Sequence, residues 1–341
     1  MSTASATLTV QSVRYPTASS VQLTFAAPAE PLRYRAGQYL TFRVLVDGRP
    51  YFRAYSLVGS PFCSDPLSIL AKRVEGGVVS TYLQKHAKAG LSLSVSVPQG
   101  RFFVEPGAQK RRVVLVGGGS GITPLYAIAR ELLHGEAETT VSLLYCNVSP
   151  EEIILYEEIN TLAAEYPGRF RVVHVVERNA TRVGALALRL DVQTAAELLR
   201  DIDLERDASY YLCGPSGLMD VVREACRVLH VSPMRVFEEK FEVTQDHGAS
   251  GEIHSVRLLL GGREYQLNVP SCTSLLDAAL ESGVPVDSSC RVGDCGTCKL
   301  LLMSGSVEQS KVEGLSPEEE TAGYVLSCVS RPRSAALLVG P

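Results

Sequence analysis

Between residue 110 and about residue 241, short apolar segments alternate with amphipathic segments of helical length. RRVVLVGG, TVSLLYCN, RFRVVHVVE and ASYYLCG are typical of strands, and TPLYAIARELLHG is typical of the helices between them. The run SPEEIILYEEINTLAAEYPG predicts one long helix that begins after Ser149. Consecutive parallel strands need a crossover connection, so this alternation predicts a parallel sheet covered by helices on both faces.

The segments on either side follow different patterns. Residues 7 to about 106 hold short β-branched or aromatic runs broken by Pro and Gly, which are typical of a barrel or sandwich. EVTQDHGASGE is polar and non-periodic, as in a linker, and a hairpin turning at Gly261-Gly262 follows it. We therefore predict a multidomain chain with a β-barrel domain at 1–108, an α/β domain at 109–241, a linker at 242–252 and an α+β domain at 253–341.

Composition and charge narrow the class of protein. The chain has 341 residues, a net charge of −4 and nine cysteines, so nucleic acid is not an expected partner. The start, MSTASATLTVQSV, lacks the basic and apolar segments of a signal peptide, and the apolar runs are too short to insert in a membrane. We expect a cytoplasmic protein whose thiols serve metal binding or catalysis more than disulfides.

Four cysteines near the C-terminus have the spacing of a metal site. CRVGDCGTCKL places three of them at C-x4-C-x2-C, and a fourth follows 29 residues later. Structural zinc sites usually pair two short knuckles, and a disulfide knot needs an oxidising compartment. This spacing is instead typical of a 2Fe–2S cluster bound by thiolates. The predicted ligands are Cys290, Cys295, Cys298 and Cys328.

Two glycine-rich turns end strands of the α/β segment. GGGSGITP (Gly117–Pro124) joins a strand to a helix, and so does CGP (Cys213–Pro215) about ninety residues later. Glycine lets the backbone approach a pyrophosphate closely, although a tight turn without a ligand explains each loop equally well. Cys213 is either a residue beside the ligand or a small apolar strand residue.

Two short motifs in the β-rich segment suit a flavin nucleotide. Arg53-Ala54-Tyr55-Ser56 lies on a predicted strand, where an Arg can pair with phosphate, a Tyr can stack on a flat ring and a Ser can reach a ring nitrogen. Gly76-Gly77-Val78-Val79-Ser80 is a glycine turn that enters a helix. Alone, the four residues of the first motif are equally consistent with an exposed surface.

Together and in this order, the five motifs resemble those of ferredoxin–NADP reductase-like flavoproteins fused to a plant-type ferredoxin domain. The resemblance covers essentially the whole chain and fits best the reductases that serve oxygenases. It implies a β-barrel FAD domain, a nucleotide domain and a ferredoxin domain of the β-grasp type. It also implies that NAD(P)H supplies electrons, through FAD and a 2Fe–2S cluster, to a partner oxygenase, hydroxylase or desaturase.

The resemblance further implies a role for individual residues. Arg53 would hold the FAD pyrophosphate, Tyr55 would stack on the isoalloxazine, Ser56 would lie near flavin N5, and Ala54 would belong to the same cofactor-binding set. The FAD diphosphate would lie against Gly77, Val78 and Ser80. The nicotinamide nucleotide would be received by Gly118, Gly119, Ser120, Gly121, Thr123 and Pro124. Cys213 would lie beside the nicotinamide, Gly214 and Pro215 would shape that turn, and Phe241 would be the aromatic near the flavin. Ser56 and Cys213 are thus the residues expected at the reacting atoms.

The sequence leaves alternatives open for the coenzyme, for the identity of the flavin and for the role of the protein. Many NADPH-preferring relatives carry Ser-Arg where this chain has Glu177-Arg178, and Asn147-Val148-Ser149 lacks an Arg that relatives often have. A carboxylate repels a 2′-phosphate, so NADH is favoured over NADPH. FMN in place of FAD, a permanently bound electron-wiring subunit and a redox sensor are the other readings. The acidic run Glu318–Glu320 is a solvated helix face or a docking patch for a basic partner.

Overall fold

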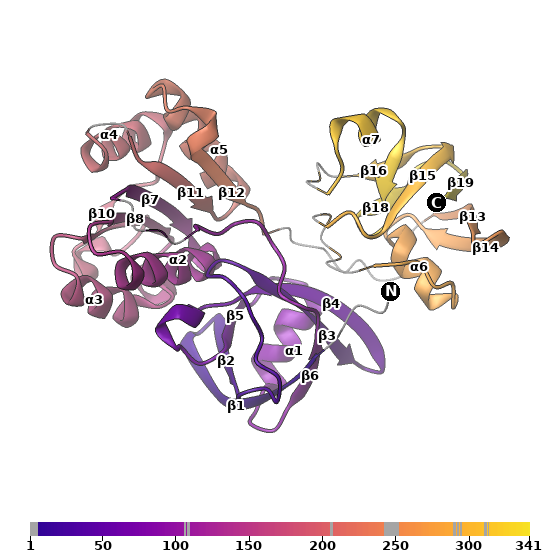
Figure 1. Ribbon diagram of the computed structural model, residues 1–341, viewed down its shortest axis with the longest axis horizontal. Helices are drawn as coiled ribbons and strands as arrows, with labels where there is room; N and C mark the ends of the chain where they lie inside the picture. Colours follow the sequence, from indigo (N-terminus) through magenta and orange to yellow (C-terminus); the bar gives the residue numbers. More distant parts are fainter. Residues whose placement is uncertain are drawn as a thin grey trace.

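The computed structural model describes residues 6–105, 107, 110–204, 207–241, 252–288, 291, 293, 295–309, 312 and 314–341. Within these residues, three sheets of five or six strands follow one another along the chain, each with its own helices (Figure 1). The predicted multidomain fold class is confirmed. Across the described ranges, no helix is both long and apolar enough to cross a membrane.

The first sheet is antiparallel and curls on itself. Its strands, in the order β4-β3-β6-β1-β2-β5, are β1 (Ala6–Thr17), β2 (Ser20–Phe25), β3 (Tyr39–Val46), β4 (Arg49–Ser56), β5 (Ser68–Lys72) and β6 (Ser92–Val95). The two outermost strands approach each other just past β4, where Leu57 pairs with Ile69 and the Val58 N–H donates to the Ser68 carbonyl at 3.0 Å. Helix α1 (Val78–His86) packs against this sheet and buries Val79 and Leu83.

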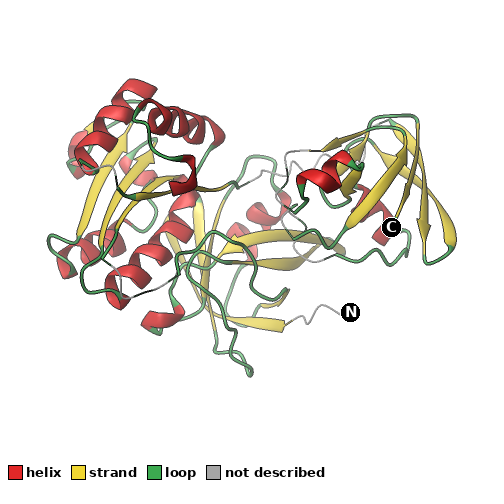
Figure 2. Ribbon diagram, turned by 45° about the horizontal axis from the view of Figure 1, so that its top comes forward, coloured by secondary structure: helices red, strands yellow, loops and turns green. Residues whose placement is uncertain are grey.

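The second sheet is parallel throughout, with the order β10-β9-β8-β7-β11-β12. Its strands are β7 (Arg112–Gly118), β8 (Thr140–Asn147), β9 (Phe170–Val176), β10 (Leu186–Ala187), β11 (Ser209–Cys213) and β12 (Val236–Glu239). The helices are α2 (Ile122–Gly135), α3 (Tyr156–Glu165), α4 (Val192–Ile202) and α5 (Ser216–Val228). The first two pack on one face and the last two on the other (Figure 2).

The third sheet is mixed, with the order β14-β13-β19-β15-β17 and one parallel pair, β13 with β19. Its elements are β13 (Ile253–Leu260), β14 (Arg263–Pro270), α6 (Leu275–Glu281), β15 (Lys299–Ser304), α7 (Pro317–Thr321), β17 (Tyr324–Leu326) and β19 (Ala336–Gly340). A separate pair joins β16 (Val307–Gln309) to β18 (Ser330–Pro332). The hairpin turn predicted at Gly261-Gly262 is confirmed, because Leu260 pairs with Arg263 and both glycines have positive φ, +58° and +76°.

The predicted helix start after Ser149 is wrong. Pro150–Glu152 forms only a short 3-10 turn, and α3 begins at Tyr156. Ile153, Ile154 and Leu155 are all buried, and one amphipathic helix cannot turn three consecutive residues toward the same core. The chain therefore changes direction at Leu155, which has φ of +59°.

The first two sheets share one hydrophobic core. Barrel-side residues such as Val58, Leu70 and Phe102 belong to the same buried cluster as α2, and the Phe102 ring meets Tyr211 edge-on with centroids 5.5 Å apart. Ion pairs reinforce this contact, including Arg130 with Asp65 at 2.8 Å. The third sheet has a separate core.

Candidate functional site

The strand order of the parallel sheet reverses beside β7. The chain proceeds from β7 through β8 and β9 to β10 on one side, then crosses to β11 on the other. Ligands of open α/β sheets bind at such a switch point, at the carboxyl ends of the strands. The two glycine turns of the sequence, after β7 and after β11, lie at this point.

Glycine is required where these two turns meet. A Cβ on Gly121 would lie 2.1 Å from the Cys213 carbonyl oxygen, and one on Gly214 would lie 2.9 Å from the Gly118 nitrogen. A Cβ on Gly118 would lie 2.8 Å from Cδ of Pro215. The loops thus pack backbone to backbone, which leaves no room for a side chain between them.

The first of these loops leads into the N-terminus of α2. Gly121 precedes the helix and provides no side-chain cap, and the Thr123 hydroxyl donates to the Ser120 carbonyl at 3.0 Å. The Tyr145 hydroxyl donates to the Gly119 carbonyl at 2.9 Å, which ties the loop to strand β8. A helix N-terminus of this kind, reached through glycines, fits the pyrophosphate of a nucleotide.

Cys213 is buried completely, with 0% of its side chain exposed. It pairs in register with Gly117 on one side and Glu239 on the other, and its side chain belongs to the core cluster around α2. Burial, followed by the nearby Glu239 carboxylate, raises the pKa of this thiol well above its ordinary value. The structure therefore places a protonated thiol beneath the turn.

The four residues of the predicted flavin motif end strand β4. Arg53 donates to the Phe52 carbonyl at 2.7 Å, and the Tyr55 ring meets Phe42 edge-on with centroids 5.8 Å apart. Ser56 is buried, and its hydroxyl donates to a Glu239 carboxylate oxygen at 3.4 Å. This contact joins the end of the flavin motif to β12 of the parallel sheet.

Glu239 is a site residue that the sequence analysis missed. It contacts Ser56, pairs with Cys213 in the sheet, and has Oε1 3.8 Å from the Cβ position of Gly100. Its position in FEEKF, two residues before Phe241, was the available signal. Phe241 itself lies just beyond β12 and is 38% exposed, so its ring is accessible to a ligand.

The second flavin motif forms the turn into α1. Gly76 has φ of +72°, and Gly77 precedes the helix without a side-chain cap. A Cβ on Gly77 would lie 2.7 Å from the Ser80 hydroxyl, which accepts from the Val74 N–H at 3.1 Å. Val78 is the first helical residue, so the turn presents a close-packed backbone and a helix N-terminus suited to a diphosphate.

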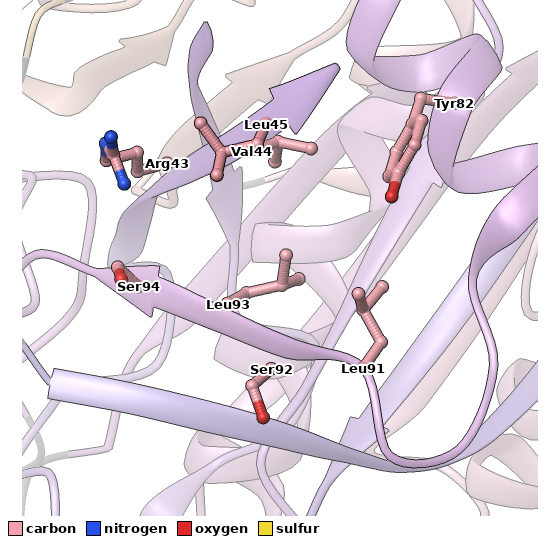
Figure 3. A pocket seen from close by; sticks show the side chains of 8 residues that line it. All are labelled: Arg43, Val44, Leu45, Tyr82, Leu91, Ser92, Leu93 and Ser94. Carbon is pink, nitrogen blue, oxygen red and sulfur yellow. The ribbon is translucent and has the colours of Figure 1, made fainter. Parts of the chain in front are cut away.

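A cavity of about 230 Å³ opens in the wall of the barrel (Figure 3). It lies where β3 and β6 separate, beyond the pair Arg43–Ser94. Tyr82 of α1 closes one side. The cavity is lined by none of the predicted site residues, so it does not correspond to the flavin site expected from the sequence.

Two of the predicted cluster ligands are directly joined. A hydrogen bond with the Cys328 side chain lowers the pKa of Cys298 to about 7, and the nearby Cys295 acts in the opposite direction. Cys298 is buried, whereas Cys295 is exposed and lies 3.2 Å from the Thr297 hydroxyl. Cys290 lies outside the described residues. Among those that are described, no three potential ligands are close enough together to hold a metal ion.

The loop around these cysteines fits a buried cluster. Gly293 and Gly296 have φ of +80° and +73°, and a Cβ on them would lie 2.8 Å from Val312 and 2.7 Å from the Gly314 carbonyl oxygen. Only glycine allows both the backbone conformation and the close packing. The Ser327 N–H donates to the Cys298 carbonyl at 3.1 Å, which ties the loop to the segment carrying Cys328.

The residues predicted to set coenzyme preference meet at the carboxyl edge of the sheet. Glu177 follows β9, and its N–H donates to the Asn147 carbonyl at 3.2 Å. The Arg178 N–H donates to the Val148 carbonyl at 3.1 Å. The Glu177 carboxylate lies 3.9 Å from Nε of Arg189 and is 40% exposed, so it is available to an incoming ribose.

Comparison with known proteins identifies the three domains. An oxidoreductase FAD-binding domain matches residues 7–104, an oxidoreductase NAD-binding domain matches residues 115–224, and a 2Fe-2S iron-sulfur cluster binding domain matches residues 259–333. The chain is also 32% identical to one of the subunits of 1,2-phenylacetyl-CoA epoxidase from Escherichia coli K12, over 97% of this chain and 96% of that protein. The chain belongs to this family of FAD- and 2Fe–2S-containing reductases.

Other members of the family have the same extent. The ferredoxin reductase component of 3-ketosteroid-9-alpha-monooxygenase from Rhodococcus rhodochrous is 32% identical, over 95% of this chain and 93% of that protein. The structure of phthalate dioxygenase reductase superposes with a TM-score of 0.74 and 26% identity, over 98% and 97% of the two chains.

Membership of this reductase family identifies the class of enzyme and its cofactors. The protein is an NAD(P)H-dependent oxidoreductase, and its cofactors are FAD and a 2Fe–2S cluster. The alternatives of a zinc site and a disulfide knot for the four cysteines are thereby excluded, and FAD is supported over FMN.

Proposed function

We propose that this protein is the reductase component of an oxygenase system, which takes electrons from NADH and delivers them to a separate terminal oxygenase, hydroxylase or desaturase. The observation that carries the proposal is the contact between Ser56 and Glu239, which joins the end of the flavin motif to β12 beside Cys213, at the carboxyl edge of the nucleotide sheet. Several relatives of similar length are named as reductase components of oxygenases. We further propose a cytoplasmic location and domain limits at residues 108, 241 and 252.

In this proposal, the barrel residues hold and orient the flavin. When bound, FAD would supply the two-electron chemistry and the cluster the one-electron chemistry of the reaction. Arg53 pairs with the FAD pyrophosphate, and the Tyr55 ring lies against the flat ring system. Gly77, Val78 and Ser80 receive the diphosphate at the start of α1.

The nucleotide residues bring the nicotinamide to the same place. The loop from Gly118 to Pro124 takes the pyrophosphate at the start of α2, and the turn Cys213-Gly214-Pro215 supports the nicotinamide end. Since the Cys213 thiol is buried and stays protonated, its role is to shape the floor of the site and not to act as a nucleophile. Glu239 fixes the Ser56 hydroxyl beside the reacting position.

The four-cysteine loop then holds the cluster from which the partner takes its electrons. Cys290, Cys295, Cys298 and Cys328 are the proposed ligands, and exposed Cys295 marks the side of the loop open to a partner. α7 is not a purely solvated acidic face, because Glu319 forms an ion pair with Lys299 and caps its own helix.

Replacing Glu177 with serine is expected to raise kcat/KM for NADPH by about tenfold, because a carboxylate near a 2′-phosphate opposes binding by roughly 1 kcal/mol or more at a hydrated surface. The value of kcat/KM for NADH is expected to fall slightly, because a hydrogen bond to the ribose is lost. Steady-state rates with both coenzymes measure the effect. Glu165→Ser, at the end of α3, is the charge-matched control. A wild-type enzyme that already prefers NADPH would contradict the proposed role of Glu177.

The proposed function is tested with the purified protein. Extracted flavin should be FAD, iron and sulfide should be present in equal amounts, and NADH should drive rapid reduction of cytochrome c. Slow or absent reduction of any one-electron acceptor would favour the redox-sensor alternative. Purification only as part of a stable larger complex would favour the permanently bound wiring subunit.

A further inference from the structure

The cluster loop touches the barrel through one largely buried cation. Arg291 lies between the first and second cysteines of the loop, and its side chain is 13% exposed. Its guanidinium carbon lies 3.4 Å from the centroid of the Phe52 ring on β4. Phe52 directly precedes Arg53, the proposed FAD residue, so this contact joins the two proposed cofactor sites at positions next to their ligands.

An ion pair within the ferredoxin domain also fixes the position of the Arg291 side chain. Nη1 of Arg291 lies 3.0 Å from an Asp277 carboxylate oxygen on α6. The backbone of Arg291 has φ of +60°, a conformation that is unfavourable for a residue with a Cβ. A chain accepts such a conformation where surrounding contacts determine it, and here the Asp277 pair and the Phe52 ring supply those contacts.

A second contact also joins β4 to the ferredoxin domain, but to α6 and not to the cluster loop, and it is exposed. Arg49 of β4 lies 3.4 Å from Glu281 of α6, and both side chains are more than 60% exposed. Exposed pairs of this kind contribute little to an equilibrium. Asp277 and Glu281 are four residues apart and so lie on one face of α6, which pairs with Arg291 of the cluster loop and with Arg49 of β4. The Arg291–Phe52 contact, in which the Arg291 side chain is only 13% exposed, is therefore the stronger of the two.

We propose that Arg291 is a positioning residue that clamps the cluster loop against β4 through the Phe52 ring and so fixes the distance between the flavin and cluster sites. This inference rests on the proposed function, because the clamp matters only if both cofactors are bound. A cation on an aromatic face gains strength as the two groups are removed from water, and here the Arg291 guanidinium is largely buried and the Phe52 ring is partly buried. Electron transfer between two centres slows steeply as their separation grows, so a loose loop would slow this internal step.

Two other roles of Arg291 make different predictions. If Arg291 acted only by supporting the loop through Asp277, removing the Phe52 ring would have no effect. If Arg291 acted only through its positive charge beside the cluster, removing the Phe52 ring would again have no effect. Replacing Arg291 by a neutral residue would then change the reduction potential of the cluster. Only the clamp predicts that substitutions of Arg291 and of Phe52 slow electron transfer to the same extent, and that their effects do not add in the double variant.

The test compares Arg291→Gln, Phe52→Leu and the double variant in the full-length holoprotein. Arg257→Gln is the control, since Arg257 is an exposed arginine of the same domain that pairs with Glu264 at 3.4 Å. FAD, iron and the paramagnetic signal of the reduced cluster are measured first, to establish that both cofactors are bound. Small-angle scattering then reports the fraction of molecules with the ferredoxin domain released, and rapid mixing with NADH separates flavin reduction from electron arrival at the cluster.

Each single variant is expected to lower the ratio of docked to released molecules by about tenfold, the effect of losing one desolvated cation–π contact. Electron arrival at the cluster slows, flavin reduction by NADH does not, and the double variant is no worse than either single one. Arg291→Lys, which keeps a cation, is expected to fall between Arg291→Gln and wild type. Normal docking and transfer in Phe52→Leu would overturn the clamp. A wild-type protein without FAD, iron or NADH-driven flavin reduction would instead overturn the proposed function.

Discussion

Replacing Cys298 with alanine is expected to abolish the cluster and, with it, the reduction of cytochrome c by NADH. Cys298 is buried and hydrogen bonded to Cys328, so the variant loses a ligand at the centre of the loop. Removing a residue that only hydrogen bonds to a metal ligand typically lowers metal affinity or activity by about 10- to 100-fold. Removing the ligand itself should have a larger effect. Iron content and the visible spectrum measure assembly, and cytochrome c reduction measures the consequence.

Two comparisons make the Cys298 result specific. Cys272→Ser changes another partly buried cysteine of the same domain, and we expect it to retain both cluster and activity. Ferricyanide, which can take electrons from a flavin directly, should still be reduced by NADH with Cys298→Ala. Undiminished cytochrome c reduction in a variant that lacks iron would show that electrons leave from the flavin, contrary to this account.

Replacing Gly121 with alanine is expected to lower NADH-driven flavin reduction by on the order of a hundredfold, the typical result of displacing a binding group by about 1 Å. The new Cβ would lie 2.1 Å from the Cys213 carbonyl oxygen, which is backbone and cannot rotate away. The two turns must then separate, and we also expect a loss of stability of about 1–3 kcal/mol from overpacking. Stopped-flow absorbance and thermal unfolding measure the two effects.

Gly217→Ala is the matched control for Gly121→Ala. Gly217 lies in α5 of the same domain, and a Cβ there would have no atom within 4 Å. We expect unchanged kinetics and slightly higher stability, because alanine is favoured in a helix by roughly 0.5–1 kcal/mol. Dithionite should still reduce FAD and cluster in both variants. Normal reduction by NADH in Gly121→Ala would mean that the two glycine turns do not form the nucleotide site.

The domain architecture was largely predictable from local patterns. Alternating apolar strands and helices at residues 110–241 predicted a parallel sheet, and Gly261-Gly262 predicted a hairpin, since strand and turn preferences depend on neighbouring residues. The glycines of the two nucleotide turns were also visible. Why Gly121 and Gly214 must be glycine became clear only with the backbone atoms of the opposite turn, which lie 2.1 and 2.9 Å from their Cβ positions.

Features that depend on contacts between distant segments were not predictable in this way. Glu239 differs from the neighbouring Glu238 because its carboxylate accepts a hydrogen bond from the hydroxyl of Ser56, which lies 183 residues earlier in the chain. Cys213 could be a ligand-side or a core residue until its complete burial was known. The helix expected after Ser149 failed because Ile153–Leu155 enter a core that helical periodicity alone does not describe. Arg291 gave no sequence signal, because its partner Phe52 belongs to another domain.

The central claim is that electrons from NADH pass through FAD to the cluster before they leave the protein. Anaerobic mixing with stoichiometric NADH, followed by rapid freezing and electron paramagnetic resonance, tests this claim most directly. We expect the flavin absorbance to bleach first and the signal of a reduced 2Fe–2S cluster to appear next, no more slowly than cytochrome c is reduced. A bleached flavin with no cluster signal, while cytochrome c is still reduced, would contradict the account.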